Sequence, residues 1–191
     1  LLHAEVGYNA DNVVQVKLHA DRQPTEKIFS FKEELKKSPL VARAAYSSNV
    51  PGEVLGTSHF KLNVEGNEAS KIVHLMTIDA DYIPLMEMEF KEGGNYDPER
   101  PREEQSGVIL NEACINFLGL GDILVDKVIV WNIEILGVFK NGKYNSLHDD
   151  SRPIVFNFGT HTRGYMNIKL NTTEVHAAME YIQETYESFF E

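Results

Sequence analysis

Apolar and polar residues follow regular patterns at the start of the chain. Residues 12–19 alternate apolar with polar side chains, which predicts a half-buried strand. Residues 24–37 carry apolar side chains every three or four positions, which predicts an amphipathic helix that ends before Pro39. Residues 41–50 are rich in small and β-branched side chains and predict a second strand. The opening of the chain therefore predicts a βαβ-type unit.

The end of the chain repeats the order strand then helix. Residues 152–158 and 165–170 predict strands, and Asn171 with Glu174 has the spacing of a capping box. An apolar stripe of period near 3.6 then predicts a helix: Val175, Ala178, Ile182, Tyr186 and Phe189. No Gly, Asn or Pro follows that helix, and residue 1 is Leu. We therefore expect a piece of a longer protein, with another strand beyond the last helix.

The middle of the chain predicts short strands, and these lie at 60–64, 72–78, 108–110, 127–130 and 131–139. The polar residues 91–106 predict an exposed loop. Asn111 and Gly119 predict the two ends of a short helix over residues 112–118, and Asn141-Gly142 predicts a turn.

Together these patterns predict an α+β fold. We expect residues 1–51 and 152–191 to form one discontinuous, split ferredoxin-like lobe. Residues 52–151 are expected to form an inserted β-rich lobe with its own small core and one short helix.

Composition narrows the function classes. The 191 residues include 18 Lys and Arg against 29 Asp and Glu, a net charge of −11. This acidic balance argues against nucleic-acid binding and against docking on an anionic membrane surface. A single cysteine, Cys114, excludes an internal disulfide and a cysteine-built metal site.

Candidate reactive groups are sparse. Gly119-Leu120-Gly121 follows a helix, whereas a phosphate-binding loop should precede one. No two of the seven histidines lie three or four residues apart, so no helix offers a ready pair of metal ligands. His148-Asp149-Asp150 comes closest to a metal or acid–base cluster and defines an enzyme hypothesis. A polar turn before a strand is the favoured interpretation of that cluster.

Two further candidates are interpreted as structural. Asp79 and Asp81 point to the same side of an extended segment, as an acid–base pair would need. Two aspartates at the end of a strand are more often solvated. Cys114 lies among apolar residues and is interpreted as a buried structural thiol rather than a nucleophile. The residues therefore predict no catalytic, cofactor-binding or metal-binding site.

Several segments, in order along nearly the whole chain, resemble MacB/FtsX-type ABC transporter permeases. The resembling stretches are GYNADNV (7–13), FKEELKKSPLV (31–41), AAYSSNVPG (44–52), DADYIPLM (79–86) with EGG (92–94), GVILNEA (107–113), GVFKNGKYNSL (137–147) and Arg152-Pro153. In that family they belong to the extracytoplasmic core domain between the first two membrane helices.

The resemblance implies a porter-like lobe built from both chain ends and an inserted β-rich lobe. It also implies a non-catalytic role: the domain relays conformational change and contacts cargo or envelope partners. Implied partners are an ABC ATPase subunit or domain reached through membrane helices, a second permease copy and periplasmic or envelope proteins. No cofactor and no nucleic acid is expected. The implied location is the bacterial inner membrane, with the domain facing the periplasm.

Two questions remain open from the sequence. The chain crosses between the expected lobes near Pro51-Gly52 and near Arg152-Pro153, and these crossings are either hinges or simple turns. The alternative function is a soluble peptide- or protein-binding module of the cell envelope that uses an edge strand or residues 91–106.

Overall fold

A computed structural model describes residues 6–8, 12–19, 25–50, 53, 55–64, 67–97, 99–100, 107–121, 129–130, 133–141, 152–159, 163–171 and 173–190. The elements are β1 (Val6–Tyr8), β2 (Val13–His19), α1 (Thr25–Leu35), β3 (Val41–Ser47), β4 (Gly56–Val64), β5 (Asn67–Ile78), α2 (Tyr82–Leu85), β6 (Phe90–Gly93), β7 (Gly107–Asn111), α3 (Glu112–Leu118), β8 (Ile129–Val130), β9 (Ile133–Phe139), β10 (Ile154–Phe158), β11 (Arg163–Leu170) and α4 (Val175–Phe190). The described part of the chain is thus a mixed α/β structure.

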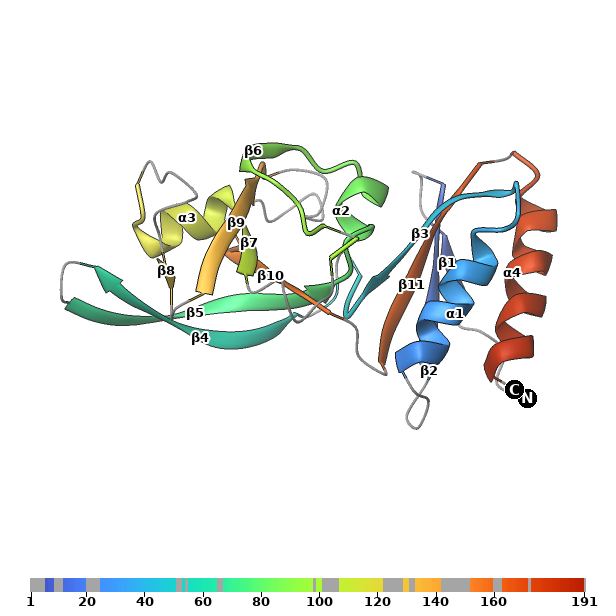
Figure 1. The fold of residues 1–191 in the computed structure, drawn as a ribbon, viewed down its shortest axis with the longest axis horizontal. Coiled ribbons are helices and arrows are strands. Elements are labelled where there is room, and N and C mark those ends of the chain that lie inside the picture. Colours follow the sequence, from blue (N-terminus) through green and yellow to red (C-terminus); the bar gives the residue numbers. More distant parts are fainter. Residues whose placement is uncertain are drawn as a thin grey trace.

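The strands form one mixed sheet that runs through an elongated molecule. Their order is β1-β2-β11-β3-β5-β10-β7-β9-β6, with β4 paired to β5 and β8 paired to β9. Figure 1 shows two bodies along the long axis. We call β1, β2, α1, β3, β11 and α4 the terminal lobe, and the elements from β4 to β10 the middle lobe.

In the terminal lobe, two helices cover one face of four antiparallel strands (Figure 1). Alternation along β2 turns Val14, Val16 and Leu18 toward the helices, where they pack with Phe31 of α1 and Ile182 of α4. All five side chains are buried. The period-2 pattern of the strands and the period-3.6 pattern of the helices therefore meet in one apolar core.

The middle lobe has an apolar cluster on each face of its strands. On one face, α3 packs Cys114 and Leu118 against β7 and β9. On the other face, Met76 and Phe156 pack with α2. Strand β10 runs parallel to β5 and antiparallel to β7, and β4 and β5 form a long hairpin.

Several predicted elements agree with the structure, and α3 agrees at both ends. The Asn111 side chain caps α3 by accepting the backbone N–H of Cys114, and Gly119 ends the helix in the left-handed conformation with φ 73°. The predicted strands at 60–64 and 72–78 are the described hairpin β4–β5, which is longer than predicted. Residues 127–128, 131–132 and the Gly142 half of the predicted turn lie outside the described residues.

Two sequence predictions differ from the structure, and one element was not predicted. Residues 91–106 are not all an exposed loop, because Phe90–Gly93 is strand β6 and Tyr96 is buried. Burial of Tyr96 is possible because its hydroxyl donates to the carbonyl oxygen of Phe156 at 2.9 Å. The single-turn helix α2 has no predicted counterpart. Helix α4 begins at Val175, three residues after the position that a cap at Asn171 implies.

The boundary expected at residue 152 also divides the chain differently from the strand pairing. It assigns β10 to the lobe of the chain ends. Strand β10 instead pairs with β5 and β7, and its buried Ile154, Val155 and Phe156 join the clusters of the middle lobe. In the strand pairing, β10 thus lies with β5 and β7, whereas β11 lies with β2 and β3.

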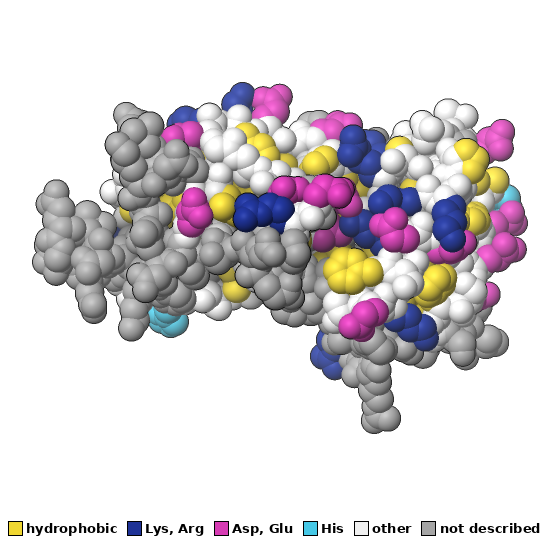
Figure 2. Space-filling model, in the orientation of Figure 1, with side chains coloured by type: hydrophobic (Ala, Val, Ile, Leu, Met, Phe, Trp, Pro, Cys, Tyr) yellow, Lys and Arg dark blue, Asp and Glu magenta, His cyan; other side chains and the backbone are white. Residues whose placement is uncertain are grey.

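The surface carries mixed charge. On the face in Figure 2, acidic and basic side chains are interleaved, and hydrophobic side chains form small separate areas. The large hydrophobic side chains that are exposed among the described residues are Phe29, Ile72 and Phe117. These three come from α1, β5 and α3.

Candidate functional site at the lobe junction

The two lobes meet where β3 and β5 end, and regular pairing is minimal there. The register between these strands consists of one pair of residues, Ser47 and Ile78. Beyond it, the backbone N–H of Ser48 donates to Thr77, and the N–H of Asp79 donates to the carbonyl oxygen of Tyr46. The sheet is therefore continuous but narrow at the junction.

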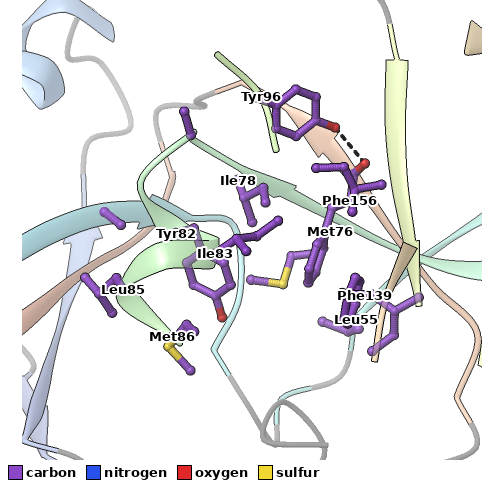
Figure 3. Packing of buried hydrophobic residues seen from close by; sticks show 14 of the residues in the cluster. Leu55, Met76, Ile78, Tyr82, Ile83, Leu85, Met86, Tyr96, Phe139 and Phe156 are labelled. Carbon is purple, nitrogen blue, oxygen red and sulfur yellow. Dashed lines mark hydrogen bonds between the residues drawn. The ribbon is translucent and has the colours of Figure 1, made fainter. Parts of the chain in front are cut away.

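Helix α2 fills the space beside this narrow connection. Figure 3 shows Tyr82, Ile83, Leu85 and Met86 grouped on and just after α2, next to side chains of the middle lobe. The same cluster includes Val13 of β2 and Ala45 of β3. These two terminal-lobe residues face away from α1 and α4. The helix thus belongs to the core of the middle lobe and also contacts the open face of the terminal sheet.

A buried lysine joins the two lobes at the same place. The Lys32 Nζ atom on α1 lies 2.6 Å from Asp79 Oδ2 and 2.5 Å from Asp81 Oδ2. The Lys32 and Asp79 side chains are 8% and 5% exposed, whereas Asp81 is 36% exposed. We call Lys32, Asp79 and Asp81 the junction triad. The structure thereby overturns the solvated interpretation of Asp79.

The electrostatics of the triad combine burial with close opposite charge. Burial raises the pKa of Asp79, and the Lys32 charge and the backbone N–H of Tyr46 oppose that rise. Burial acts to lower the pKa of Lys32, but the Asp79 and Asp81 carboxylates outweigh it, so the pKa of Lys32 is raised. Asp79 accepts hydrogen bonds from three donors: Lys32, Tyr46 N–H and Asp81 N–H. These donors favour its ionised form.

The lysine of the triad was missing from the sequence-based candidates. Residues Ile28, Phe31 and Leu35 define the buried face of α1, and Lys32 lies on that same face. A lysine inside an apolar stripe is the signal that indicates a buried acidic partner. The sequence does not show which acid pairs with it, because Asp79 lies 47 residues away.

One weaker ion pair crosses the junction elsewhere, and one hydrogen bond joins β11 to the connection between β3 and β4. Lys169 of β11 lies 3.5 Å from the Glu87 carboxylate, with both side chains partly exposed. The Tyr165 hydroxyl of β11 donates to the Glu53 carboxylate. Beside Glu53 is an open polar cleft of about 440 Å³, lined by Lys17, Leu18, Ser48, Glu53, Arg163, Gly164 and Tyr165. None of these cleft residues was a candidate from the sequence.

The remaining sequence candidates stay apart from the junction. Cys114 is buried in α3, and burial raises the pKa of its thiol to about 12, so the thiolate is scarce near neutral pH. Gly119 and Gly121 follow α3 in left-handed conformations. His148, Asp149 and Asp150 lie outside the described residues. Within the described ranges, no three His, Cys, Asp or Glu residues are grouped as metal ligands would be.

Comparison with known proteins supplies the context for this architecture. No family model and no curated protein sequence matches the chain. Among solved structures, the periplasmic region of MacB from Actinobacillus actinomycetemcomitans matches 93% of this chain and 83% of its own length, with a TM-score of 0.63 and 14% identity. The chain has the fold of MacB periplasmic domains.

Two more solved structures carry this MacB-type fold. The extracellular domain of YknZ, a noncanonic ABC-type transporter from Gram-positive bacteria, matches 91% of the chain and 94% of its own length, with a TM-score of 0.60 and 13% identity. A domain of a putative permease from Porphyromonas gingivalis matches 94% of the chain and 84% of its own length, with a TM-score of 0.60 and 17% identity. The matches span both lobes. Among the described residues, no helix is long and apolar enough to cross a membrane.

Proposed function

We propose that the chain is the extracytoplasmic domain of a MacB/FtsX-type ABC transporter permease. The observation that carries the proposal is the similarity over more than nine-tenths of the chain to the periplasmic region of MacB, the extracellular domain of YknZ and a domain of a putative permease. The domain is non-catalytic in this proposal. ATP hydrolysis takes place on a cytoplasmic subunit or domain, and this chain lies on the periplasmic side of the inner membrane.

The terminal lobe is proposed to be the porter-like lobe. For its strands β2, β3 and β11, with the helices α1 and α4, we propose the split ferredoxin-like arrangement, and the position of β11 between β2 and β3 supports this. Strand β1 lies antiparallel beside β2, at the edge where that arrangement has its fourth strand. We propose that this lobe comprises the chain ends and that the middle lobe extends to the end of β10.

The proposed role is to relay conformational change between membrane helices and envelope partners. The first described strand, β1, and the last described helix, α4, both belong to the terminal lobe. In the proposed orientation, movement of the membrane helices acts on the terminal lobe first and reaches the middle lobe through the junction. Relays of this kind need an element with two arrangements, not a reactive site.

The test is removal of this domain from the full permease, with the ATPase kept. We expect transport to be lost while ATP turnover continues without its dependence on cargo. The matched control is the permease with Asn116→Ala, an exposed position on α3. Unchanged coupling between ATP turnover and transport in the deletion would rule out the relay.

A second candidate function is binding of an envelope peptide or protein, and the polar cleft beside β11 favours it. The cleft presents Lys17 and Arg163 together with the Glu53 carboxylate. Capture of a partner from membrane-free extract by the wild-type chain, lost in a Lys17→Glu and Arg163→Glu double variant, would support this role. Equal capture by both proteins would contradict binding at the cleft.

A further inference from the structure

The junction is held together differently from the rest of the sheet. Strands β2 and β11 pair over seven residues, from Lys169 to Arg163, whereas β3 and β5 pair at one residue each. The apolar part of the junction is also small. Among the described residues, Val13 and Ala45 are the terminal-lobe members of the cluster around α2. Neither side chain is large, so apolar burial holds the lobes together weakly.

The junction triad is the charged part of this interface. Lys32 belongs to the terminal lobe, and Asp79 and Asp81 follow β5 in the middle lobe. Short distances and backbone donors on Asp79 fix the triad in one geometry. A rotation of α1 away from the segment that carries Asp79 and Asp81 would separate the Lys32 ammonium from both carboxylates.

A buried ion pair suits a contact that must be specific and also separable. Its Coulombic gain is largely offset by the loss of hydration, so its net contribution to stability is small. When two lobes part, both charges regain water. When the lobes stay together and one partner is missing, the remaining buried charge is strongly unfavourable. Such a contact defines one orientation without making it permanent.

We propose that the junction triad is a latch that fixes the orientation of the terminal lobe relative to the middle lobe. Its release lets the lobes rotate about the narrow β3–β5 connection. The latch is the element of the proposed relay that has two arrangements. Its role in transport rests on the proposed function. The effect of the triad on the orientation of the lobes can be measured on this chain alone.

The experiment measures the distance between the lobes by electron–electron double resonance. Spin labels are attached to Glu184→Cys on α4 and Asn116→Cys on α3, both exposed, in a Cys114→Ala background. The wild-type junction is expected to give one narrow distance distribution. Lys32→Met keeps the length of the side chain and removes its charge. It is expected to raise the ratio of open to closed molecules by about tenfold or more.

Two further variants show whether the charge is the cause. The control Lys36→Met removes an exposed lysine directly after the end of α1, whose partner Glu33 lies in the last turn of that helix, and is expected to leave the distribution unchanged. The double variant Lys32→Met with Asp79→Leu removes both members of the buried pair, and with them the latch, so it is expected to stay as broad as Lys32→Met. A return to the narrow distribution would show that an unpaired buried charge, not the loss of the latch, opens the lobes in Lys32→Met, and would overturn the latch. A wild-type distribution in Lys32→Met, or the same broadening in Lys36→Met, would overturn the latch.

The milder variant Asp81→Asn keeps the test decisive if Lys32→Met does not fold. It removes the more exposed carboxylate and is expected to broaden the distribution in the same direction, by a smaller factor. A wild-type distribution for Asp81→Asn would then contradict the latch. These measurements use the 191-residue chain alone, so failure of the latch is distinguishable from failure of the transport role, which the domain deletion tests.

Discussion

The core of the terminal lobe and the junction show two ways of holding one sheet together. In the core, Phe31 contacts the rings of Tyr186, Phe189 and Phe190 within an apolar cluster. At the junction, a lysine on the same helix is held by two carboxylates. Apolar packing stabilises without defining one partner, whereas the ion triad defines the partner at little net gain. The comparison suggests that the cores provide stability and the junction provides orientation.

The largest expected effect concerns the apolar core of the terminal lobe. Phe31→Ala removes a fully buried ring and leaves a cavity in the terminal lobe. We expect a loss of about 3–5 kcal/mol in the free energy of unfolding, measured by urea denaturation. The matched control Phe29→Ala, at an exposed position on the same helix, should cost less than about 1 kcal/mol. Equal losses in the two variants would contradict the assignment of the core.

The next effect concerns the polar anchor of the middle lobe. Asn111 accepts the backbone N–H groups of Cys114 and Ile154 and donates to the carbonyl oxygen of Arg152. Asn111→Ala removes the helix cap and leaves these buried groups without that partner. We expect a loss of about 2–3 kcal/mol in the free energy of unfolding. Asn116→Ala, an exposed asparagine on α3, is the control, and a similar loss there would refute the anchor.

The third effect uses pH to separate charge from packing at the junction. Burial raises the pKa of Asp79, and Lys32→Met removes the cation that opposes that rise. The folded variant then binds a proton at pH values where the unfolded chain has lost it, since an unfolded aspartate has a pKa of about 3.9. Its free energy of unfolding should therefore increase as the pH falls through the raised folded pKa.

Urea denaturation near pH 7 and near pH 5 measures this dependence. We expect the stability difference between Lys32→Met and wild type to shrink at the lower pH, because protonation of Asp79 removes the unpaired buried charge from the folded variant. Lys36→Met should show no such dependence. A difference that stays constant between the two pH values would mean that packing, not charge, explains the effect of Lys32→Met.

The smallest effect is expected at the exposed link between the lobes. Lys169 and Glu87 also connect the terminal and middle lobes, but both side chains are partly exposed to water. Lys169→Met should change the free energy of unfolding by less than about 1 kcal/mol and leave the inter-lobe distance unchanged. A distance change as large as that of Lys32→Met would show that burial does not explain the effect of the triad on the inter-lobe distance.

The sequence predicts local features well and the junction poorly, for physical reasons. Helix α3 has its cap and its terminating glycine within the same segment, so Asn111 and Gly119 define it without tertiary information. Helix α2 is a single turn with Pro84 inside, and no periodicity develops over four residues. The pairing of Lys32 with Asp79 depends on how two distant elements dock. Burial of Tyr96 depends on strand β10, which supplies the acceptor for its hydroxyl.

In a working permease, the junction is proposed to transmit movement between the lobes. The most direct measurement is the inter-lobe distance in the full permease with and without ATP, using the spin-label positions at Glu184 and Asn116. We expect ATP to shift the wild-type distribution, and we expect Lys32→Met, but not Lys36→Met, to remove the shift and to uncouple ATP turnover from transport. A wild-type distribution that ATP leaves unchanged would contradict this role of the junction.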